Sequence, residues 1–220
     1  MDHDLVTQLS TLPCSSISDA LDRLGILGSA IGIAPLVNGL KLAGPAYTIR
    51  YAPVRKPAGT VGDYIEDVEP GSVIVLDNYG RTDCTVWGDI LTTIALSRGI
   101  AGTAINGVCR DVHKAIETGY PIYSKGRFMR TGKDRVEVVE IGGAVTLGDV
   151  QVRASDIIVG DDDGVVIVPQ NQAHAIIAVA TEISQKESAI VSDALAMRSL
   201  RDSRSKHGYH SLQSSNEPKS

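Results

Sequence analysis

Arg110 and Asp111 are the two residues of this 220-residue chain whose types and position most strongly suggest chemistry. They follow an apolar, strand-like run that breaks at Asn106-Gly107, and they precede a helical pattern. A guanidinium can form two parallel hydrogen bonds with a carboxylate, and an aspartate beside it can hold a hard divalent cation. The pair therefore predicts a site for a small oxo acid at a strand-to-helix corner. A simple salt bridge at the start of a surface helix is the alternative.

A second candidate lies upstream at Trp87-Gly88-Asp89-Ile90-Leu91. A helix that begins here leaves the amides of Ile90 and Leu91 without partners inside the helix, at the positive end of its dipole. Gly88 would let a ligand approach the backbone closely, and such a helix start suits a carboxylate. The alternative is that Asp89 only complements the helix dipole. Both candidates follow the carboxyl end of an apolar strand, where α/β sheets bind ligands, so we expect them to form one site.

Other residues of reactive type carry weaker predictions. Residues 160–164 contain three aspartates, but an EF-hand register would place Val159 and Gln170 where charged ligands are needed, so we predict a polar hairpin turn. Cys109 could be a thiolate nucleophile beside a cation, although a buried structural thiol is the simpler interpretation. His113 is predicted to lie on a helix surface. The sequence contains no zinc-protease, P-loop, nucleophile-elbow or strand-led dinucleotide motif.

Hydrophobic periodicity predicts an α/β fold in which these motifs connect strands to helices. Helices are expected over residues 1–27, 88–99, 112–118 and 171–200. Strands are expected over residues 44–51, 72–77, 100–105, 136–141, 145–152, 157–159 and 165–168. We find no dividing linker and no internal repeat, so residues 1–200 are predicted to form one domain. Residues 201–220 are polar and rich in serine, and they are predicted to be a disordered tail.

Composition argues against several classes of protein. The net charge is −5 and the sequence pI is about 5.5, with no basic run before Arg198–Lys206, so we expect no nucleic-acid partner. Three widely spaced cysteines without a CxxC motif indicate reduced thiols in a cytoplasmic protein. No secretory signal follows Met1, and no apolar run approaches the roughly 20 residues of a membrane span. We therefore expect no membrane association.

The chain resembles the RraA-like proteins, a family that includes the class II 4-hydroxy-4-methyl-2-oxoglutarate/4-carboxy-4-hydroxy-2-oxoadipate aldolases. The resemblance runs in order from about residue 10 to about residue 195. The segments that carry it are Ser18-Asp19-Ala20-Leu21, Gly44-Pro45-Ala46-Tyr47-Thr48, Gly71-Ser72-Val73-Ile74-Val75, Trp87-Gly88-Asp89, Asn106-Gly107 with Arg110-Asp111, and residues 161–169. It implies one α/β domain related to the swivelling phosphohistidine-domain β/β/α fold. It also implies a homotrimer, or a homohexamer of two trimers, with active sites between subunits.

The resemblance also implies a role for each candidate residue. Asp111 would hold Mg²⁺ or Mn²⁺, partly through water, and Arg110 would bind the substrate and stabilise enolate charge. An acid and the amides that bind the pyruvyl carboxylate would come from Gly88, Asp89, Ile90 and Leu91. An acid from a neighbouring subunit's C-terminal helix, Glu182 or Glu187, would complete the site.

Two departures from the family pattern bear on the substrate more than on the metal. Asn106 stands where the aldolases often have aspartate, and Ala154-Ser155-Asp156 replaces a common Pro-Gly-Asp.

The sequence thus predicts a divalent-metal-dependent lyase that cleaves a 4-hydroxy-2-oxo acid by a retro-aldol reaction and releases pyruvate. Decarboxylation of oxaloacetate is the expected side activity, because it leaves the same pyruvate enolate. One alternative is a non-catalytic RraA-type regulator that binds and inhibits a ribonuclease. Another is the same metal–enolate chemistry on a different pyruvyl substrate. The presence of both Asp89 and Asp111 favours an enzyme over a binding protein.

Overall fold

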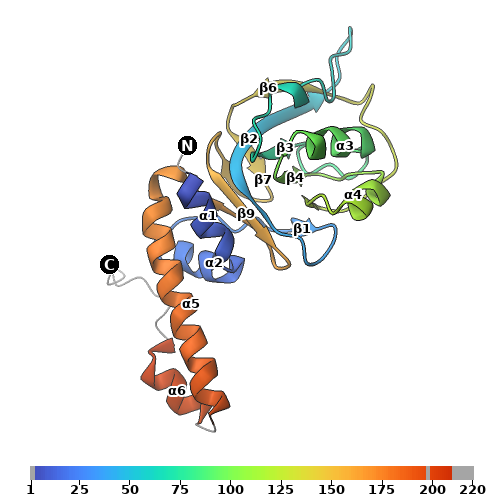
Figure 1. Cartoon of the computed structure of the whole chain (residues 1–220). Helices are drawn as coiled ribbons and strands as arrows, with labels where there is room; N and C mark the ends of the chain where they lie inside the picture. Colours follow the sequence, from blue (N-terminus) through green and yellow to red (C-terminus); the bar gives the residue numbers. More distant parts are fainter. Residues whose placement is uncertain (1–2, 197–198, 210–220) are drawn as a thin grey trace.

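In a computed structural model, which describes residues 3–196 and 199–209, the chain is built around a sheet of eight strands (Figure 1). The strand order is β1-β5-β4-β3-β2-β9-β10, and β6 also pairs with β2. A separate two-stranded sheet consists of β7 and β8. The strands are β1 (Ala34–Pro35), β2 (Leu42–Pro53), β3 (Val73–Asp77), β4 (Gly102–Asn106), β5 (Ile122–Ser124), β6 (Val136–Ile141), β7 (Val145–Leu147), β8 (Val150–Val152), β9 (Ile157–Asp161) and β10 (Gly164–Val168).

The helices lie on two sides of this sheet (Figure 1). They are α1 (His3–Thr11), α2 (Cys14–Arg23), α3 (Asp89–Ser97), α4 (Val112–Thr118), α5 (Ala173–Leu195) and α6 (Leu200–Lys206), with short 3-10 turns at Ile65–Asp67 and Gln170–Gln172. Where the sequence predicts helix over residues 1–27, the structure has two helices that separate before Pro13. The proline has no backbone N–H and cannot continue a helix of which it would be an interior residue.

Strand β2 links two differently paired parts of the sheet. Its residues 46–50 run parallel to β3, while its residues 42–45 pair with β9 in the antiparallel sense. Strands β3 and β4 are parallel neighbours in which Asp77 is opposite Asn106, and β4 is parallel to β5. Because parallel strands end at the same edge, the segments that follow β3 and β4 begin side by side.

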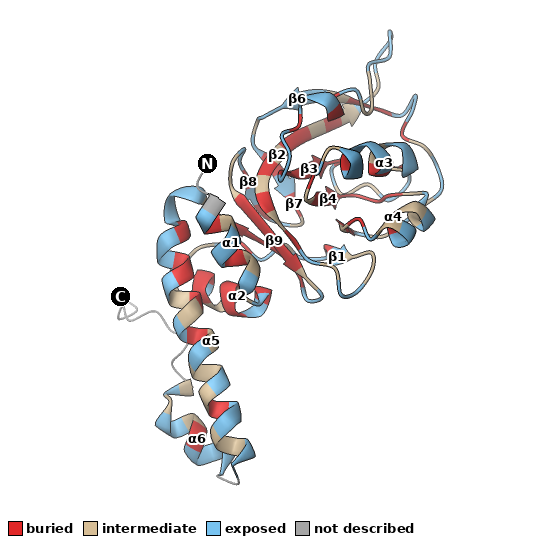
Figure 2. Ribbon diagram, in the orientation of Figure 1, coloured by how far each residue is buried: buried red, intermediate tan, exposed pale blue. Residues whose placement is uncertain are grey.

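Three buried clusters hold the elements together, as the red segments of Figure 2 show. One includes Trp87, Tyr64 and Ala95, and it packs α3 and α4 against the sheet. A second packs α1, α2 and α5 against β9 and β10, and the third covers the sheet with β7 and β8. The fold class predicted from the sequence, α/β, is confirmed.

The C-terminal region differs from the prediction. Helix α6 occupies part of the segment predicted to be disordered, and it lies against the end of α5, which projects away from the sheet (Figure 1). Ser199 caps α6 by accepting a hydrogen bond from the amide of Asp202, and Asp193 of α5 pairs with both Lys206 and His207. These contacts stabilise a helix in a segment that has few apolar side chains to bury. The rest of the predicted tail, residues 210–220, lies outside the described residues.

Smaller differences arise where a turn was not recognised from the sequence. The predicted strand over residues 145–152 is a hairpin, β7 and β8, that turns at Gly148, whose φ is +63°. Strand β5 was not predicted, because three residues are too few to show a period. The hairpin of β9 and β10 and the bounds of α4 agree with the prediction.

Candidate active site

The segments that follow β3 and β4 run side by side and place the two predicted motifs together. The amide of Asn78 donates to the carbonyl oxygen of Asn106 at 3.1 Å. Further along, Thr85 forms a parallel bridge with Val108, and the amide of Arg110 donates to the carbonyl oxygen of Trp87 at 2.9 Å. The Arg110-Asp111 pair is therefore fixed by backbone contacts beside the start of α3.

Gly88 shows how closely the two motifs approach each other. A Cβ atom on Gly88 would lie 2.7 Å from Asp111 Oδ2 and 3.4 Å from Arg110 Nε. A side chain there would displace the end of the Asp111 side chain, so the glycine lets the two motifs approach closely. Arg110 Nε and Asp111 Oδ2 are 3.1 Å apart, and both side chains are a little over a third exposed. Asp111 has a left-handed φ of 53°, an uncommon conformation for a non-glycine residue that is often retained at functional sites.

A cavity of about 500 Å³ opens beside this corner. Its lining includes five of the predicted site residues: Gly88, Asp89, Ile90, Leu91 and Arg110. Another wall comes from a segment that the sequence analysis did not single out, residues 61–66 between β2 and β3. Among the described residues that line the cavity, Arg110 is the only cation and none is a histidine or a lysine.

The start of α3 differs from the prediction in one respect. The amide of Ile90, predicted to be free for a ligand, donates to Asp89 Oδ1 at 2.8 Å. The sequence could not show this, because the bond depends on the rotamer of Asp89. The Asp89 carboxylate thus occupies the position that a substrate carboxylate was expected to take, and it is exposed enough to leave that position.

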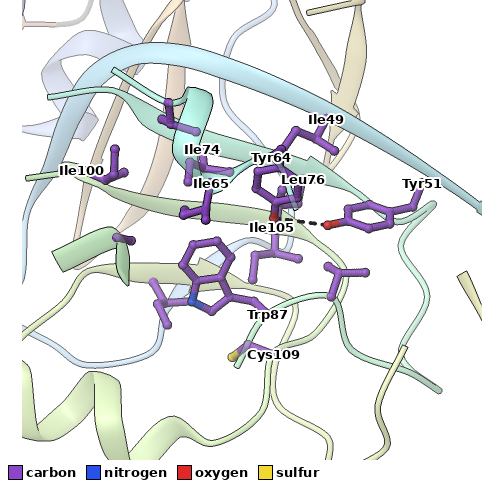
Figure 3. Close-up of a cluster of buried hydrophobic side chains, with 14 of the residues drawn as sticks. Ile49, Tyr51, Tyr64, Ile65, Ile74, Leu76, Trp87, Ile100, Ile105 and Cys109 are labelled. Carbon is purple, nitrogen blue, oxygen red and sulfur yellow. Dashed lines mark hydrogen bonds between the residues drawn. The ribbon is translucent and has the colours of Figure 1, made fainter. Parts of the chain in front are cut away.

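The floor of the site is buried and hydrogen-bonded. Trp87 Nε1 donates to Thr92 Oγ1 at 2.9 Å, and that hydroxyl lies 2.9 Å from the carbonyl oxygen of Gly88. The Trp87 ring stacks on Tyr120 with ring centroids 6.1 Å apart. Figure 3 shows Trp87 beside Ile65 and Tyr64 within this core, so the same packing supports the start of α3 and the facing wall.

Two polar residues that the sequence analysis did not assign to the site hold the strand ends together. Asn106 Nδ2 donates to Asp77 Oδ1 at 2.9 Å, and Asp77 Oδ2 accepts from the amide of Thr146. Asn106 is therefore an internal partner of Asp77. A polar residue at the end of each strand is the sequence signal that indicates this contact.

The remaining candidates lie away from the cavity. His113 is exposed on α4, as predicted, and Cys109 is fully buried, so that burial raises the pKa of its thiol. Glu182 of α5 pairs with Lys186 at 2.6 Å and with Arg23 at 3.0 Å, which lowers its pKa. Glu187, also of α5, lies in a groove beside the start of α2, and partial burial raises its pKa.

Two of the three aspartates of the β9–β10 hairpin use their carboxylates within the fold. Asp161 Oδ2 accepts from the amide of Cys14 at 2.8 Å, and Asp161 Oδ1 accepts from the amide of Asp163 at 3.0 Å. Asp162 Oδ1 accepts from the amide of Gly39 at 2.6 Å. The prediction of a polar turn is confirmed. Within residues 3–196 and 199–209, no group of three or more histidine, cysteine or acidic side chains is arranged to hold a metal ion.

The fold and the cavity define an α/β protein with an acid–cation corner at the carboxyl ends of parallel strands. This chain belongs to the RraA-like family, because the family model described as Aldolase/RraA matches residues 14–167. None of the helices in the described part of the chain is long and apolar enough to cross a membrane.

Two relatives illustrate the range of proteins that the chain is similar to. Protein DlpA of Legionella pneumophila is 38% identical over 94% of this chain, although the chain spans only 34% of that protein's length. A protein of Halalkalibacterium halodurans is 34% identical over 89% of this chain and 92% of its own length. That relative carries the name "Putative 4-hydroxy-4-methyl-2-oxoglutarate aldolase".

Solved structures agree with the fold. An uncharacterized protein from Pseudomonas syringae pv. tomato has a TM-score of 0.87 at 38% identity, covering 93% of this chain and 98% of that one. RraAS2 of Streptomyces coelicolor has a TM-score of 0.79 at 30% identity, covering 86% of this chain and 96% of that one. It is described as an unusual member of the RNase ES inhibitor RraA protein family.

Proposed function

We propose that this protein is a divalent-metal-dependent lyase that cleaves a 4-hydroxy-2-oxo acid by a retro-aldol reaction and releases pyruvate. The observation that carries the proposal is the meeting of Arg110 and Asp111 with Gly88, beside a cavity that Gly88, Asp89 and Arg110 line. A cation, an exposed acid and a helix start at one corner are the groups needed to bind an oxo acid and to stabilise negative charge on it. The aldolase names of relatives support the same reaction class.

Mg²⁺ or Mn²⁺ fits the acids at this corner. Both ions prefer oxygen donors, and Mg²⁺ in particular is commonly bound through one or two carboxylates while it keeps several waters. Asp111 would hold the ion, since its carboxylate is exposed and, within the described part of the chain, pairs with the neighbouring Arg110 alone. When bound, such an ion supplies a Lewis acid that polarises the 2-oxo group of the substrate.

Arg110 and the start of α3 would bind the pyruvyl part of the substrate. A substrate carboxylate at the amides of Ile90 and Leu91 would displace Asp89 Oδ1 from the Ile90 amide and free the Asp89 carboxylate. The Arg110 guanidinium would then be paired with the oxygen on which negative charge develops. Both interactions are set by backbone contacts that already exist in the folded chain.

The bond changes need one proton acceptor. The C3–C4 bond breaks and its electron pair remains on C3 as the enolate of pyruvate, while the 4-hydroxyl group loses its proton and C4 becomes a carbonyl carbon. A water held by the freed Asp89 carboxylate would accept that proton, because no described residue lining the cavity is a histidine or a lysine. Return of this proton from the water to C3 completes pyruvate. Loss of carbon dioxide from oxaloacetate leaves the same enolate, so decarboxylation is the proposed side activity.

A second copy of the chain would complete the site. We propose a homotrimer, or a homohexamer of two trimers, in which the projecting helix α5 of one subunit reaches the cavity of the next (Figure 1). Glu187 is the better candidate for the contributed acid, because Glu182 is already neutralised by Arg23 and Lys186.

Purified protein assayed for pyruvate release tests the proposal. A 4-hydroxy-2-oxo acid and oxaloacetate are each supplied with Mg²⁺, with EDTA, and with Mg²⁺ restored after EDTA. We expect activity only when the metal is present, and we expect Asp111→Asn to lose it. Activity that survives both EDTA and Asp111→Asn would rule the mechanism out.

The alternative from another class is a regulator that binds a ribonuclease. The similarity to RraAS2, which is described as a member of a ribonuclease-inhibitor family, favours it. It predicts no turnover of any oxo acid, and it predicts a stable complex with a ribonuclease that survives loss of Asp111. The same metal–enolate chemistry on another pyruvyl substrate would instead give EDTA-sensitive pyruvate release from a different compound.

A further inference from the structure

Two threonines near the start of α3 contact backbone carbonyls, and they differ in burial. Thr93 is exposed, and its hydroxyl donates to the carbonyl oxygen of Asp89 at 2.8 Å. Thr92 is 1% exposed, and its Oγ1 lies 2.9 Å from the carbonyl oxygen of Gly88. A threonine hydroxyl in a helix commonly bonds to the carbonyl four residues before it. Thr92 is therefore distinguished by its burial and by a second partner, the indole of Trp87.

The chemistry of the indole fixes the direction of both hydrogen bonds. An indole N–H can only donate, so Trp87 Nε1 is the donor to Thr92 Oγ1 at 2.9 Å. The single proton of the Thr92 hydroxyl is then directed to the carbonyl oxygen of Gly88. The amide of Thr92 donates to the same carbonyl oxygen at 3.0 Å. Two donors from one residue thus set the orientation of the peptide that joins Gly88 to Asp89.

The indole is itself held on both sides of its backbone. Its ring stacks on Tyr120 with ring centroids 6.1 Å apart and planes 6° apart, inside the core shown in Figure 3. The Tyr120 hydroxyl lies 2.9 Å from Thr103 Oγ1, and both residues are buried. The backbone carbonyl of Trp87 accepts the amide of Arg110. Trp87 therefore holds Arg110 through its backbone and the start of α3 through its side chain.

We infer that Thr92 is a positioning residue of the proposed site. Its hydroxyl, held by Trp87, fixes the Gly88 peptide and thereby the direction of the amides of Ile90 and Leu91. The inference rests on the proposed function, in which these amides bind the pyruvyl carboxylate. Thr92 is not part of the cavity lining, so it acts through Gly88 and touches no substrate. Donors that are fixed before the substrate arrives need no ordering when it binds.

The kinetics of Thr92→Val test this role. Valine has nearly the shape of threonine and lacks the hydroxyl. With 4-hydroxy-4-methyl-2-oxoglutarate or oxaloacetate and saturating Mg²⁺, we expect KM to rise about tenfold while kcat changes less than about threefold, because the lost interaction serves binding. Thr92→Ser keeps the hydroxyl and should restore the wild-type KM. Thr93→Val is the matched control and should leave both constants unchanged, since the Thr93 hydroxyl is exposed to water.

Metal binding separates positioning from a general loss of structure. Thr92→Val adds no atom beside Asp111, so Mn²⁺ measured by electron paramagnetic resonance should bind as tightly as in the wild type. The variant leaves the Trp87 N–H without its acceptor and lowers the free energy of unfolding, which urea denaturation measures. Kinetics and metal binding are compared under conditions in which circular dichroism shows every variant to be folded.

A second variant tests whether the indole acts through Thr92. Trp87→Phe removes the indole N–H and keeps an aromatic ring beside Tyr120. We expect it to raise KM as Thr92→Val does, and we expect the double variant to be no worse than either single variant. Two substitutions that break one shared contact are not additive. If the two increases in KM multiply, the residues act separately and the inference is overturned.

The remaining outcomes separate the inference from the proposed function. A wild-type KM in Thr92→Val, with pyruvate still released, overturns the inference and leaves the lyase intact. Loss of Mn²⁺ binding in folded Thr92→Val also overturns it, because the residue would then support the whole corner. If the wild-type protein releases pyruvate from neither substrate, the proposed function fails and the inference fails with it.

Discussion

Acids stand at two corners of this fold, Asp111 after β4 and Asp161 in the β9–β10 hairpin, and the structure uses them differently. Both carboxylate oxygens of Asp161 accept backbone hydrogen bonds, from Cys14 and Asp163. Asp111 has an ion pair with Arg110, lies against Gly88 and remains more than a third exposed. An acid whose two oxygens accept hydrogen bonds from backbone amides stabilises the fold. An exposed acid beside a cation and a cavity keeps carboxylate oxygens that can bind a metal ion.

This difference shows why a count of acids is a poor guide to a metal site. Three consecutive aspartates in the hairpin are a denser acidic motif than Asp89 and Asp111, which are 22 residues apart in the sequence. The hairpin carboxylates accept hydrogen bonds from the amides of Cys14 and Gly39, which are distant in the sequence, so they join separate segments of the fold. Cavities with a basic side chain adjoin both corners, so the difference lies in the carboxylates: those of Asp161 and Asp162 accept backbone hydrogen bonds, and that of Asp111 pairs with Arg110.

The largest expected effect is on catalysis at Asp111. Asp111→Asn should lower kcat/KM for pyruvate release by about 100-fold or more, because an amide carries no charge to hold the metal or to balance Arg110. A coupled assay for pyruvate measures it, with Asp162→Asn as the matched control. If the two variants retain the same activity, the distinction between the corners is wrong.

Gly88→Ala tests the close approach of the two motifs. The added methyl group would lie 2.7 Å from Asp111 Oδ2 and must displace that carboxylate, so we expect about a tenfold loss in kcat/KM. Circular dichroism should show that the variant folds. Ser97→Ala, in the last turn of the same helix, serves as control. Wild-type activity in Gly88→Ala would mean that the position of Asp111 does not matter.

Asp161→Asn should lower the stability of the protein and leave its activity nearly unchanged, the opposite of Asp111→Asn. Loss of the charged acceptor for the Cys14 amide should lower the free energy of unfolding by about 1–2 kcal/mol, while pyruvate release changes less than twofold. Urea denaturation followed by circular dichroism measures the first quantity. A loss of activity as large as that of Asp111→Asn would place the hairpin in the active site.

Glu182 extends the comparison to a surface acid that is already paired. Lys186 and Arg23 lower its pKa below the ordinary 4.5, so the stabilisation is present above that value and is lost as pH falls through the lowered pKa. The side chain is 47% exposed, and solvent screening limits the effect to less than about 1 kcal/mol. Urea denaturation at pH 6 and pH 3 should show a smaller loss in Glu182→Gln than in the wild type. An equal loss would show that the pair contributes nothing.

Much of the corner could be predicted from the sequence because its signals are local. Short apolar runs that end in polar residues locate β3 and β4, and the helical patterns after them locate α3 and α4. The rule that α/β sheets bind ligands at the carboxyl ends of their strands then predicts that Asp89 and Asp111, which are 22 residues apart in the sequence, lie at one site. Gly119 and Pro121 end α4 where the sequence indicates.

What could not be predicted depends on contacts between distant segments or on one rotamer. The wall at residues 61–66 is too short to show a period, and contacts from Tyr51 and Arg98, which are distant in the sequence, hold it beside α3. The bond between Asp89 and the Ile90 amide is a rotamer choice. Helix α6 forms in a polar segment because Asp193, on another helix, pairs with Lys206 and His207.

Binding of Mn²⁺ tests the central claim most directly, because it requires no knowledge of the substrate. Electron paramagnetic resonance follows free Mn²⁺ as the protein is titrated, for the wild type, Asp111→Asn and Asp161→Asn. We predict one bound ion per chain in the wild type and in Asp161→Asn, and loss of binding in Asp111→Asn. Mn²⁺ that remains bound in Asp111→Asn but is lost in Asp161→Asn would contradict this account.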